Sequence, residues 1–313
     1  MNIIESMKEI QEKKLFYIDY EFDYKFDEFL KVGANSDLEV NEFIVNTLLD
    51  GNRMDFEHPN MGCSTFSAYL ENGDKVFGRN FDEKDCMILA LKTKPQNGYA
   101  SLSVVNLSYI GIEKESLPLN DSNRYFLLAA PYLPLDGVNE KGLAIGILRI
   151  NEAPANQQRG KKGITSTTMI RLVLDKCATV DEAIKLIDEY DMHSSANVNF
   201  HFYISDAKGE SAVIEYVDHK MSVVKSKCAT NFLLTEGYNV GGGHDRFEKM
   251  ETKLKENNEI FKDMKESMLL LKDVSGDSTR WSAVYNQTTL SLLLSVGRDY
   301  EKLYEFVLFY DRS

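Results

Sequence analysis

The organisation of this chain follows from two short stretches, Gly62-Cys63-Ser64-Thr65-Phe66 and Gly78-Arg79-Asn80-Phe81-Asp82, which the dipeptide Asn72-Gly73 separates. The runs on both sides of this dipeptide alternate apolar and polar residues, as strands do. Asn-Gly favours a two-residue hairpin turn, because both central residues of that turn take positive φ. The sequence therefore predicts a hairpin that brings the thiol of Cys63 beside Arg79 and Asp82, which are the parts of a nucleophilic site.

A cysteine thiol needs a base at neutral pH, because its ordinary pKa is about 8.5. The five histidines lie in no recognisable cysteine-protease signature: His58, His193, His201, His219 and His244. Cleavage of the Gly62–Cys63 bond would supply another base, since Cys63 would then carry an α-amino group with a pKa of about 7.7–8.0. Gly62 suits cleavage because a residue without Cβ permits close approach and strained φ/ψ. Asp82 could hold the amine, and Arg79 could lower the pKa of the thiol or bind an acidic group.

Taken alone, Cys63 has a simpler interpretation as a buried strand cysteine without chemistry. The paired motif after the hairpin favours the nucleophile. Three other features have ordinary explanations. His201 lies on an apolar strand and is interpreted as a core histidine. Trp281 is interpreted as part of the core, and the glycine run 241–243 as the entry to a helix.

The two opening stretches resemble the choloylglycine hydrolase superfamily of N-terminal nucleophile hydrolases. This superfamily cleaves linear amide C–N bonds and includes bile salt hydrolases, penicillin V acylases and acid-ceramidase-like amidases. Further segments are similar to the superfamily in the same order along the chain: 136–143 (DGVNEKGL), 202–206 with Gly209 and 212–216, Thr230-Asn231, and Thr279-Arg280-Trp281. The resemblance therefore extends from Cys63 nearly to the C-terminus.

The resemblance implies six catalytic residues: Cys63, Arg79, Asp82, Asn139, Asn231 and Arg280. Cys63 would be the nucleophile and its freed amine the base, with Arg79 and Asp82 beside it and Asp82 orienting the amine and the thiol. The two asparagines would help to form the oxyanion site, and Arg280 would stabilise the charges around the thiolate. Side-chain amides suit an oxyanion because they donate without titrating, and each such donor is worth about 2.7–4 kcal/mol.

The order of elements favours an α+β domain, with strands, then helices, then strands again after Cys63. The resemblance implies the four-layer αββα sandwich of N-terminal nucleophile hydrolases over residues 63–313. Residues 1–62 read as a mostly helical, propeptide-like segment with an extended part near Phe16–Tyr20 and a helix over 38–49, capped by Asp37 or Asn41. This segment could shield the unprocessed site, or it could pack on the domain without a regulatory role.

The periodicity predicts the remaining elements. Strands are expected at 64–70, 75–79, 100–109, 143–149, 199–205, 211–216, 221–225, 282–285 and 289–295. Helices are expected at 167–177, 245–256 and 260–271, and one after a capping box in which Thr179 is the N-cap and Glu182 reaches back.

Composition narrows the classes of function. A net charge of −13 argues against nucleic-acid binding and against attraction to anionic membranes. The four cysteines show no CxxC spacing, so a zinc site is not indicated. The N-terminus lacks an apolar h-region and no stretch has the ~18 apolar residues of a membrane span. We therefore expect a cytoplasmic protein without membrane insertion, cofactor or metal, and leave a homo-oligomer open.

The sequence thus predicts hydrolysis of a linear amide in a small amphipathic molecule by Cys63, after autoproteolysis between Gly62 and Cys63. Bile salt hydrolase or penicillin V acylase proper, or a related acyltransferase, is the first alternative. A conventional Cys–His hydrolase using His201 or His244 is the second. An uncut, non-catalytic binding homologue is the third.

Overall fold

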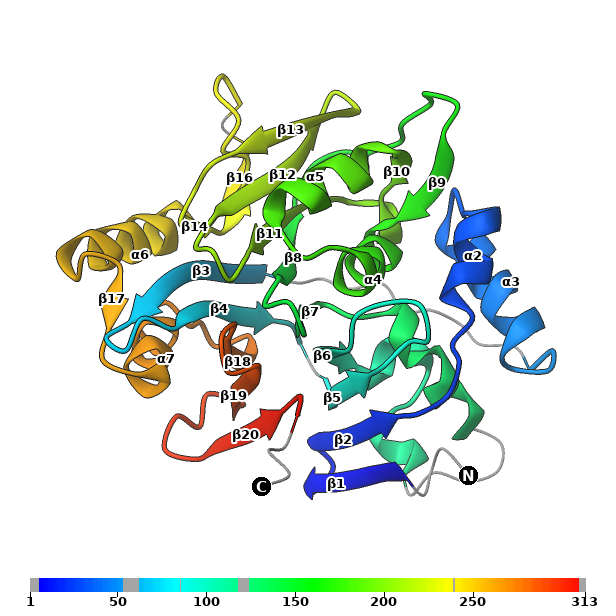
Figure 1. Cartoon of the computed structure of the whole chain (residues 1–313), viewed down its shortest axis with the longest axis horizontal. Coiled ribbons are helices and arrows are strands. Elements are labelled where there is room, and N and C mark those ends of the chain that lie inside the picture. The colour runs from blue at the N-terminus through cyan, green and yellow to red at the C-terminus, as the bar shows by residue number, and fades with distance from the viewer. Residues whose placement is uncertain (1–5, 53–61, 85, 118–123, 239, 310–313) are drawn as a thin grey trace.

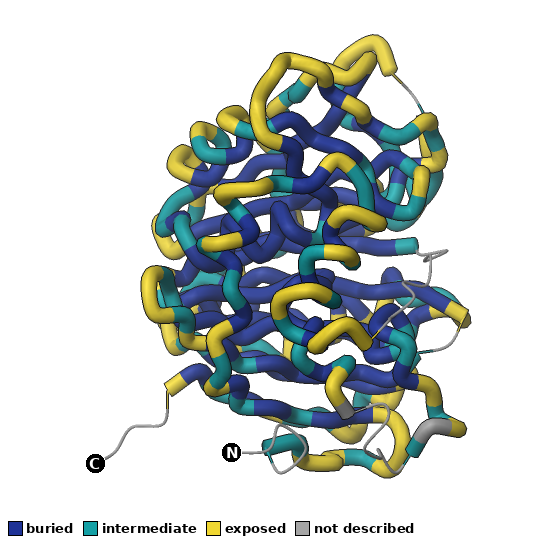
Figure 2. Tube along the Cα trace, turned by 90° about the vertical axis from the view of Figure 1, so that its right-hand side faces the viewer, coloured by how far each residue is buried: buried dark blue, intermediate teal, exposed yellow. Residues whose placement is uncertain are grey.

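The computed structural model describes residues 6–52, 62–84, 86–117, 124–238 and 240–309. Two large β-sheets are stacked on each other, and helices cover their outer faces (Figure 1). The strands in the middle of this stack are buried, whereas exposed residues concentrate in the connecting loops and on the outer faces of the helices (Figure 2).

Sheet A has nine strands in the order β1-β2-β5-β6-β7-β8-β11-β12-β13. Their bounds are β1 Met7–Gln11, β2 Leu15–Tyr20, β5 Ile88–Thr93, β6 Ser101–Asn106, β7 Asp136–Asn139, β8 Ala144–Ile150, β11 Asn199–Ser205, β12 Ser211–Val217 and β13 Lys220–Val224. All neighbouring pairs are antiparallel except β2 and β5, which run parallel. The order of the strands is therefore mainly that of consecutive hairpins.

Sheet B has the order β14-β3-β4-β18-β19-β20, with β17 added beside β3. Its strands are β3 Gly62–Leu70, β4 Lys75–Asp82, β14 Cys228–Ala229, β17 Ile260–Phe261, β18 Thr279–Asn286, β19 Ser291–Val296 and β20 Leu303–Val307. Two small pairs complete the sheets: β9 Lys162–Thr165 with β10 Tyr190–His193, and β15 Asn231–Phe232 with β16 Gly241–Gly242.

Four helices form the outer layers: α4 Ser166–Lys176 and α5 Val180–Asp188 on sheet A, and α6 His244–Glu256 and α7 Met264–Asp273 on sheet B. Side chains from the two sheets meet in the middle. The ring of Phe77 on β4 lies 5.8 Å from that of Tyr203 on β11, and Tyr203 Oη lies 2.7 Å from Ser67 Oγ on β3. On the opposite side of β4, Asn80 Nδ2 donates to the carbonyl of Leu271 in α7. This α-β-β-α layering confirms the expected fold class.

The hairpin between β3 and β4 is confirmed, but its turn differs from the expectation. Leu70 and Asp74 close the strands, so the loop has three residues, 71–73. Only Gly73 takes a positive φ, of 89°, while the side-chain oxygen of Asn72 accepts from the backbone N–H of Asp74. A turn followed by one left-handed residue is the usual three-residue solution, and it needs glycine at the last position only.

The N-terminal segment contributes strands and helices. The extended part and the helix expected over 38–49 are confirmed as β2 and as α3 Asp37–Thr47. Strand β1 and a further helix, α2 Phe26–Val32, also belong to this segment. Neither expected residue caps α3: the N-cap is Ser36, whose hydroxyl accepts from the N–H of Glu39. Strands β1 and β2 extend sheet A at one edge (Figure 1).

Two expected boundaries and one capping contact differ in detail from the expectation. The strand expected over 100–109 ends at Asn106, whose Oδ1 accepts from the N–H of Ser108 and begins a 3-10 turn, Leu107–Ile110. The helix expected over 260–271 begins only at Met264, because Asp263 caps it and residues 260–261 pair with β3 instead. In the capping box of α5, Thr179 accepts from the N–H of Glu182, and the Glu182 carboxylate accepts from Ala178.

Candidate active site

The pairing of β3 with β4 places Cys63 opposite Phe81, and Gly62 opposite Asp82. Successive side chains of a strand point to opposite faces of the sheet. Cys63 and Arg79 therefore share the face toward sheet A, where they are diagonal neighbours. Asp82 belongs to the other face, toward α6. The hairpin brings thiol, cation and carboxylate to one edge, as expected, but on two sides of it.

Arg79 makes the contact with the thiol. Its Nη2 lies 3.3 Å from Cys63 Sγ, and both side chains are fully buried. Its Nη1 is buried and has no hydrogen-bond partner among the described residues. Nε donates to Asp136 Oδ2 at 2.7 Å, so a buried carboxylate fixes the orientation of the guanidinium. Arg79 thus directs Nη2 at the sulfur, whereas its Nη1 lies beside Gly146 of sheet A.

Asp136 was not among the expected site residues, although it opens one of the quoted motifs. Besides Arg79, it accepts from the indole Nε1 of Trp281 at 3.2 Å and from the hydroxyl of Tyr285. Burial raises the pKa of Asp136 above its usual value, although Arg79 and the two other donors act to lower it. Three donors on one carboxylate favour its ionised form as the counter-charge of Arg79.

Asn139, expected in the oxyanion site, does not face the thiol. It lies three residues after Asp136 on β7 and so points to the opposite face of sheet A. Its Nδ2 donates to the carbonyls of Leu174 and Cys177 at the end of α4. Its Oδ1 accepts from two backbone N–H groups. Asn139 therefore anchors α4, and we correct its assignment to the oxyanion site.

Asn231 does lie at the candidate nucleophile. Its Oδ1 accepts from the backbone nitrogen of Cys63 at 2.7 Å, and its Nδ2 donates to the carbonyl of Arg149 at 2.8 Å. The side-chain amide of Asn231 therefore holds the nitrogen that cleavage would turn into the α-amine. An amide has two N–H groups, and Arg149 takes one of them.

Arg246 of α6 connects the parts on the outer side of the edge and was missed from the sequence. Its Nη1 lies 3.1 Å from Asp82 Oδ2 and 3.2 Å from the carbonyl oxygen of Cys63, and its Nη2 lies 2.9 Å from Asn231 Oδ1. The hydroxyl of Thr279 donates to the other oxygen of Asp82 at 2.6 Å. No motif marks Arg246 in the sequence, because it is one charge on an otherwise ordinary polar helix.

Arg280, the expected partner of the thiolate, is directed elsewhere. Thr279 pairs with Asp82 and Trp281 pairs with Phe81, so Arg280 is the extra residue of a β-bulge in β18. Its guanidinium donates to the carbonyls of Lys84 and Asp277. Its neighbours reach the site instead: Thr279 bonds Asp82, and Trp281 stacks on Phe81 with ring centroids 3.9 Å apart. We therefore correct the role assigned to Arg280.

Burial keeps the thiol protonated in this unbroken chain. Desolvation raises the pKa of Cys63 to about 11, although Arg79 and Arg246 act to lower it. The effect expected of Arg79 is thus present but weaker than burial. At neutral pH the buried thiol is therefore a poor nucleophile until a base is supplied.

Gly62 lies against the carboxylate of Asp82. A Cβ placed on Gly62 would come within 3.1 Å of Asp82 Oδ2, which is tighter than ordinary contacts. The close approach expected of this glycine is therefore observed at the bond that would be cut.

The two histidines proposed for a Cys–His pair are bound to other groups. His201 Nε2 lies 2.6 Å from the carbonyl of Thr230 and its Nδ1 lies 3.1 Å from Glu215, as expected of a core histidine. His244 is half-buried at the start of α6, with its ring 4.0 Å from that of Phe232. The glycine run leads into the same helix, with Gly243 as its N-cap. These contacts argue against the Cys–His alternative.

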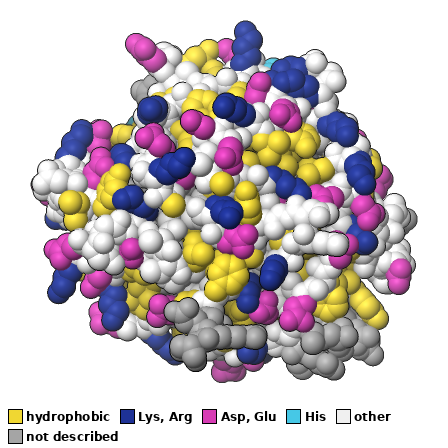
Figure 3. All heavy atoms as spheres, in the orientation of Figure 1, with side chains coloured by type: hydrophobic (Ala, Val, Ile, Leu, Met, Phe, Trp, Pro, Cys, Tyr) yellow, Lys and Arg dark blue, Asp and Glu magenta, His cyan; other side chains and the backbone are white. Residues whose placement is uncertain are grey.

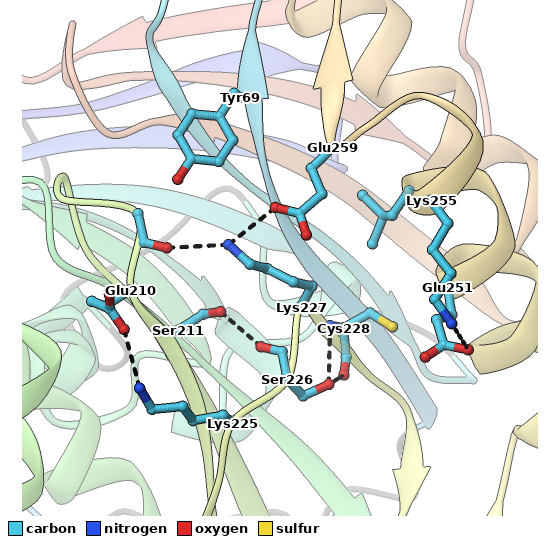
Figure 4. A pocket seen from close by; sticks show the side chains of 12 residues that line it. Tyr69, Glu210, Ser211, Lys225, Ser226, Lys227, Cys228, Glu251, Lys255 and Glu259 are labelled. Carbon is cyan, nitrogen blue, oxygen red and sulfur yellow. Dashed lines mark hydrogen bonds and ion pairs between the residues drawn. The ribbon is translucent and has the colours of Figure 1, made fainter.

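A cavity of about 500 Å³ lies at the far end of β3, between Tyr69, the turn 209–211 and α6. Figure 4 shows that its charged side chains pair with one another, Lys225 with Glu210 and Lys227 with Glu259. Tyr69 is six residues from Cys63, about 20 Å along a strand. This cavity is therefore not the place where the thiol would act.

Positive and negative side chains alternate over the face shown in Figure 3. No group of three or more His, Cys, Asp or Glu side chains is arranged to hold a metal within the described ranges. No helix of those ranges is long and apolar enough to cross a membrane.

The layered fold is that of the N-terminal nucleophile hydrolases. The chain belongs to the acyl-coenzyme A:6-aminopenicillanic acid acyl-transferase family, whose pattern matches residues 70–302, well over half of the chain. The matched range begins just after Cys63 and contains Arg79, Asp82, Asn231 and Arg246. This membership confirms the resemblance and the expectation of an enzyme.

Individual proteins agree with this assignment. The chain is 38% identical over 103 residues to a penicillin V acylase of Pectobacterium atrosepticum, a match that spans 29% of this chain and only 27% of that protein. A mutant conjugated bile acid hydrolase of Clostridium perfringens has a similar structure, with a TM-score of 0.56 over 79% of this chain and 92% of that chain at 17% identity. A second variant of that hydrolase gives a TM-score of 0.53 at 15% identity. At such identities the structures support the fold alone.

Proposed function

We propose that Cys63 is an N-terminal nucleophile, exposed by self-cleavage of the Gly62–Cys63 bond, which hydrolyses a linear amide in a small amphipathic molecule. One observation carries the proposal: the nitrogen and the sulfur of Cys63 are held by separate side chains, Asn231 at 2.7 Å and Arg79 at 3.3 Å. A single residue that both attacks and accepts the proton needs both of its atoms fixed.

Cleavage would begin with the sulfur of Cys63 attacking the carbonyl carbon of Gly62. The C–N bond breaks as the C–S bond forms, the proton of the thiol passes to the nitrogen, and a thioester joins the two parts. Water then hydrolyses the thioester, leaving a carboxylic acid on Gly62 and a free amine and thiol on Cys63. Asp82, against Gly62, would stabilise the new ammonium group.

Turnover would use the same atoms. The amine of Cys63 takes the proton of the thiol, and the thiolate attacks the amide carbonyl of the substrate. The tetrahedral intermediate collapses when its nitrogen receives the proton and leaves, and water releases the acid from the thioester. The second N–H of Asn231 is the donor that we assign to the oxyanion.

We propose that residues 1–62 stay bound after cleavage as a separate chain. Strand β2 pairs with β5 from Leu15↔Ile88 to Tyr20↔Thr93. Tyr24 donates to the buried Asp175, and Tyr17 stacks on Phe306 of β20. These contacts bury the apolar side of β2 in the main core. The segment thus acts as a structural part of the domain, whatever its effect on the uncut site.

Retention of the fragment is expected in native gel filtration, where the two chains should elute together. Intact mass spectrometry of that peak should give two masses, separated by the cut at Gly62. The chains should stay together because dissociation would remove strands β1 and β2 from the edge of sheet A. A control in denaturant should separate the chains. A native peak that contains only residues 63–313 would contradict this expectation.

The substrate class is proposed from the relatives. Penicillin V and conjugated bile acids, named in the relatives' descriptions, both carry a linear amide on an amphipathic acyl group, and N-acyl amines share this chemistry. The family's name also favours acyl transfer to an amine instead of water. Both reactions would share the same thioester, and only the group that attacks it would differ.

A panel of amides tests the proposal directly. Phenoxyacetyl, bile-acid and long-chain N-acyl amides are incubated with purified protein, with and without an added amine, and the products are identified by mass spectrometry. Release of a free acid supports hydrolysis, and a new amide supports transfer. Cut protein that turns over no member of the panel would remove the proposed substrate class, and competent protein that is still uncut would remove the mechanism.

Arg246 and Arg280 form a matched pair for testing the corrected site. Arg246→Ala should slow both cleavage and turnover by about 10- to 100-fold, because hydrogen bonds of a charged group to Asp82 and Asn231 are lost. Arg280→Ala should change either rate by no more than about twofold, because its bonds go to loop carbonyls. Intact mass over time follows cleavage, and the best amide of the panel follows turnover. The reverse ranking would restore Arg280 to the site.

A further inference from the structure

Two ionisable side chains are buried in sheet A, and none of the steps above uses them. His201 lies on β11 and Glu215 on the neighbouring strand β12, and both are fully buried. Phe202 pairs with Ile214, so the antiparallel register places His201 opposite Glu215. Cross-strand neighbours on one face are in direct reach, and Nδ1 of His201 lies 3.1 Å from Oε1 of Glu215.

Both side chains bind the segment that carries Asn231. His201 Nε2 lies 2.6 Å from the carbonyl oxygen of Thr230, the residue just before Asn231. Glu215 Oε1 accepts from the N–H of Leu234 at 2.7 Å. Its Oε2 accepts from the N–H of Thr235 at 2.9 Å and from the hydroxyl of the same residue at 2.6 Å. The segment 230–235 is therefore held at both ends by one pair of side chains.

The hydrogen bonds determine the protonation of this pair. A carbonyl oxygen only accepts, so Nε2 of His201 must carry a proton. Glu215 accepts three bonds from Leu234 and Thr235, which favours its ionised form. Burial raises the pKa of Glu215, but His201 and these donors outweigh burial and lower it. Nδ1 of His201 faces this carboxylate, which can accept a second ring proton from it.

We propose that His201 and Glu215 are positioning residues for the reaction at Cys63. As a buried imidazolium–carboxylate pair on sheet A, they fix segment 230–235 so that Asn231 holds the nitrogen of Cys63 on sheet B. The inference rests on the proposed function of Cys63. It assigns the pair no contact with substrate, since its bonds end on Thr230, Leu234 and Thr235.

The side chain of Asn231 makes three hydrogen bonds at once, so its position must be held closely. Its Oδ1 receives both Cys63 N at 2.7 Å and Arg246 Nη2 at 2.9 Å, and its Nδ2 must reach Arg149. A displacement of about 1 Å in a reacting geometry costs on the order of 100-fold in rate. A two-ended anchor restricts such displacement. Loss of the anchor should therefore lower kcat and leave KM nearly unchanged, because substrate contacts are not removed.

The first experiment does not depend on activity. Protein labelled with ¹⁵N-histidine is studied by NMR, and the signals of His201 are assigned by their loss in His201→Gln. We expect His201 to show both ring N–H protons, protected from exchange with solvent. A His201 ring with only one protonated nitrogen would overturn the ion pair, in cut and in uncut protein alike.

The second experiment measures cleavage of the Gly62–Cys63 bond and turnover of the best amide, with rates normalised to cut chain. His201→Gln and Glu215→Gln should lower kcat by about 10- to 100-fold with KM changed by no more than about twofold. Thr235→Val removes one hydroxyl of the anchor, keeps the backbone bond, and should cost less. His193→Gln, a buried strand histidine on β10, is the matched control and should behave like the wild type.

The possible outcomes test the positioning role of the pair and the proposed function of Cys63 separately. Folded His201→Gln and Glu215→Gln with kcat within about twofold of the wild type would overturn the positioning role. A rise in KM that accounts for the whole loss would overturn it as well. Wild-type protein that is never cut and turns over no amide would instead remove the proposed function, and the NMR experiment then decides alone whether the pair exists.

Discussion

Replacing Cys63 with alanine is expected to abolish both the cleavage at Gly62–Cys63 and the turnover of amides. We expect the variant to keep the fold, because the substitution removes a single heavy atom, but it has no sulfur to attack either carbonyl. Loss of a covalent nucleophile typically costs at least about 10³-fold in rate. Intact mass should show one unbroken chain, and the best amide should remain intact.

The control is a second buried thiol on a neighbouring strand. Cys228 lies on β14 of the same sheet, and burial raises its pKa to about 12. Cys228→Ala should be cut and should turn over substrate like the wild type, since its sulfur contacts no group of the site described above. Amidase activity in Cys63→Ala that exceeds the background would exclude Cys63 as the nucleophile.

Asp136→Asn is expected to give the largest loss of stability among single substitutions at the site. The change leaves Arg79 charged, fully buried and without a counter-charge. Breaking a buried ion pair from one side costs about 3–5 kcal/mol. We expect this decrease in the free energy of unfolding in urea, measured in the Cys63→Ala background so that all chains are uncut.

An exposed ion pair of the same sheet provides the comparison. Asp19 on β2 lies 2.8 Å from Lys92 on β5, and its side chain is 46% exposed. Asp19→Asn in the same background should cost no more than about 1 kcal/mol, because solvent replaces the lost partner. Equal losses for the two variants would show that the Arg79–Asp136 pair contributes nothing beyond an ordinary surface contact.

The sequence predicted the fold correctly, and four of the six candidate site residues lie together in the structure. Strand periodicity placed β3 and β4, and with them the meeting of Cys63, Arg79 and Asp82 at one edge. In the motif that starts at Asp136, the alternation of faces along a strand separates Asp136, toward the thiol, from Asn139, toward α4.

The remaining errors have causes that no single-sequence pattern contains. A bulge of one residue turned Arg280 away from the site and left Thr279 and Trp281 facing it. Arg246 reaches the site only because α6 packs beside β3, which is a tertiary contact. The His201–Glu215 pair spans two strands and a loop, so its role becomes visible only when the register is known.

The parallel pairing of β2 with β5 has a consequence for refolding. Before the cut, these strands belong to one molecule, and their association is an intramolecular event whose rate does not depend on dilution. After the proposed cut, an unfolded sample would consist of two independent polypeptides, so recovery of the native state would become second order and would fail at low concentration. The lifetime of the native processed protein would then depend on how slowly it unfolds. A single denaturation in dilute solution would be irreversible.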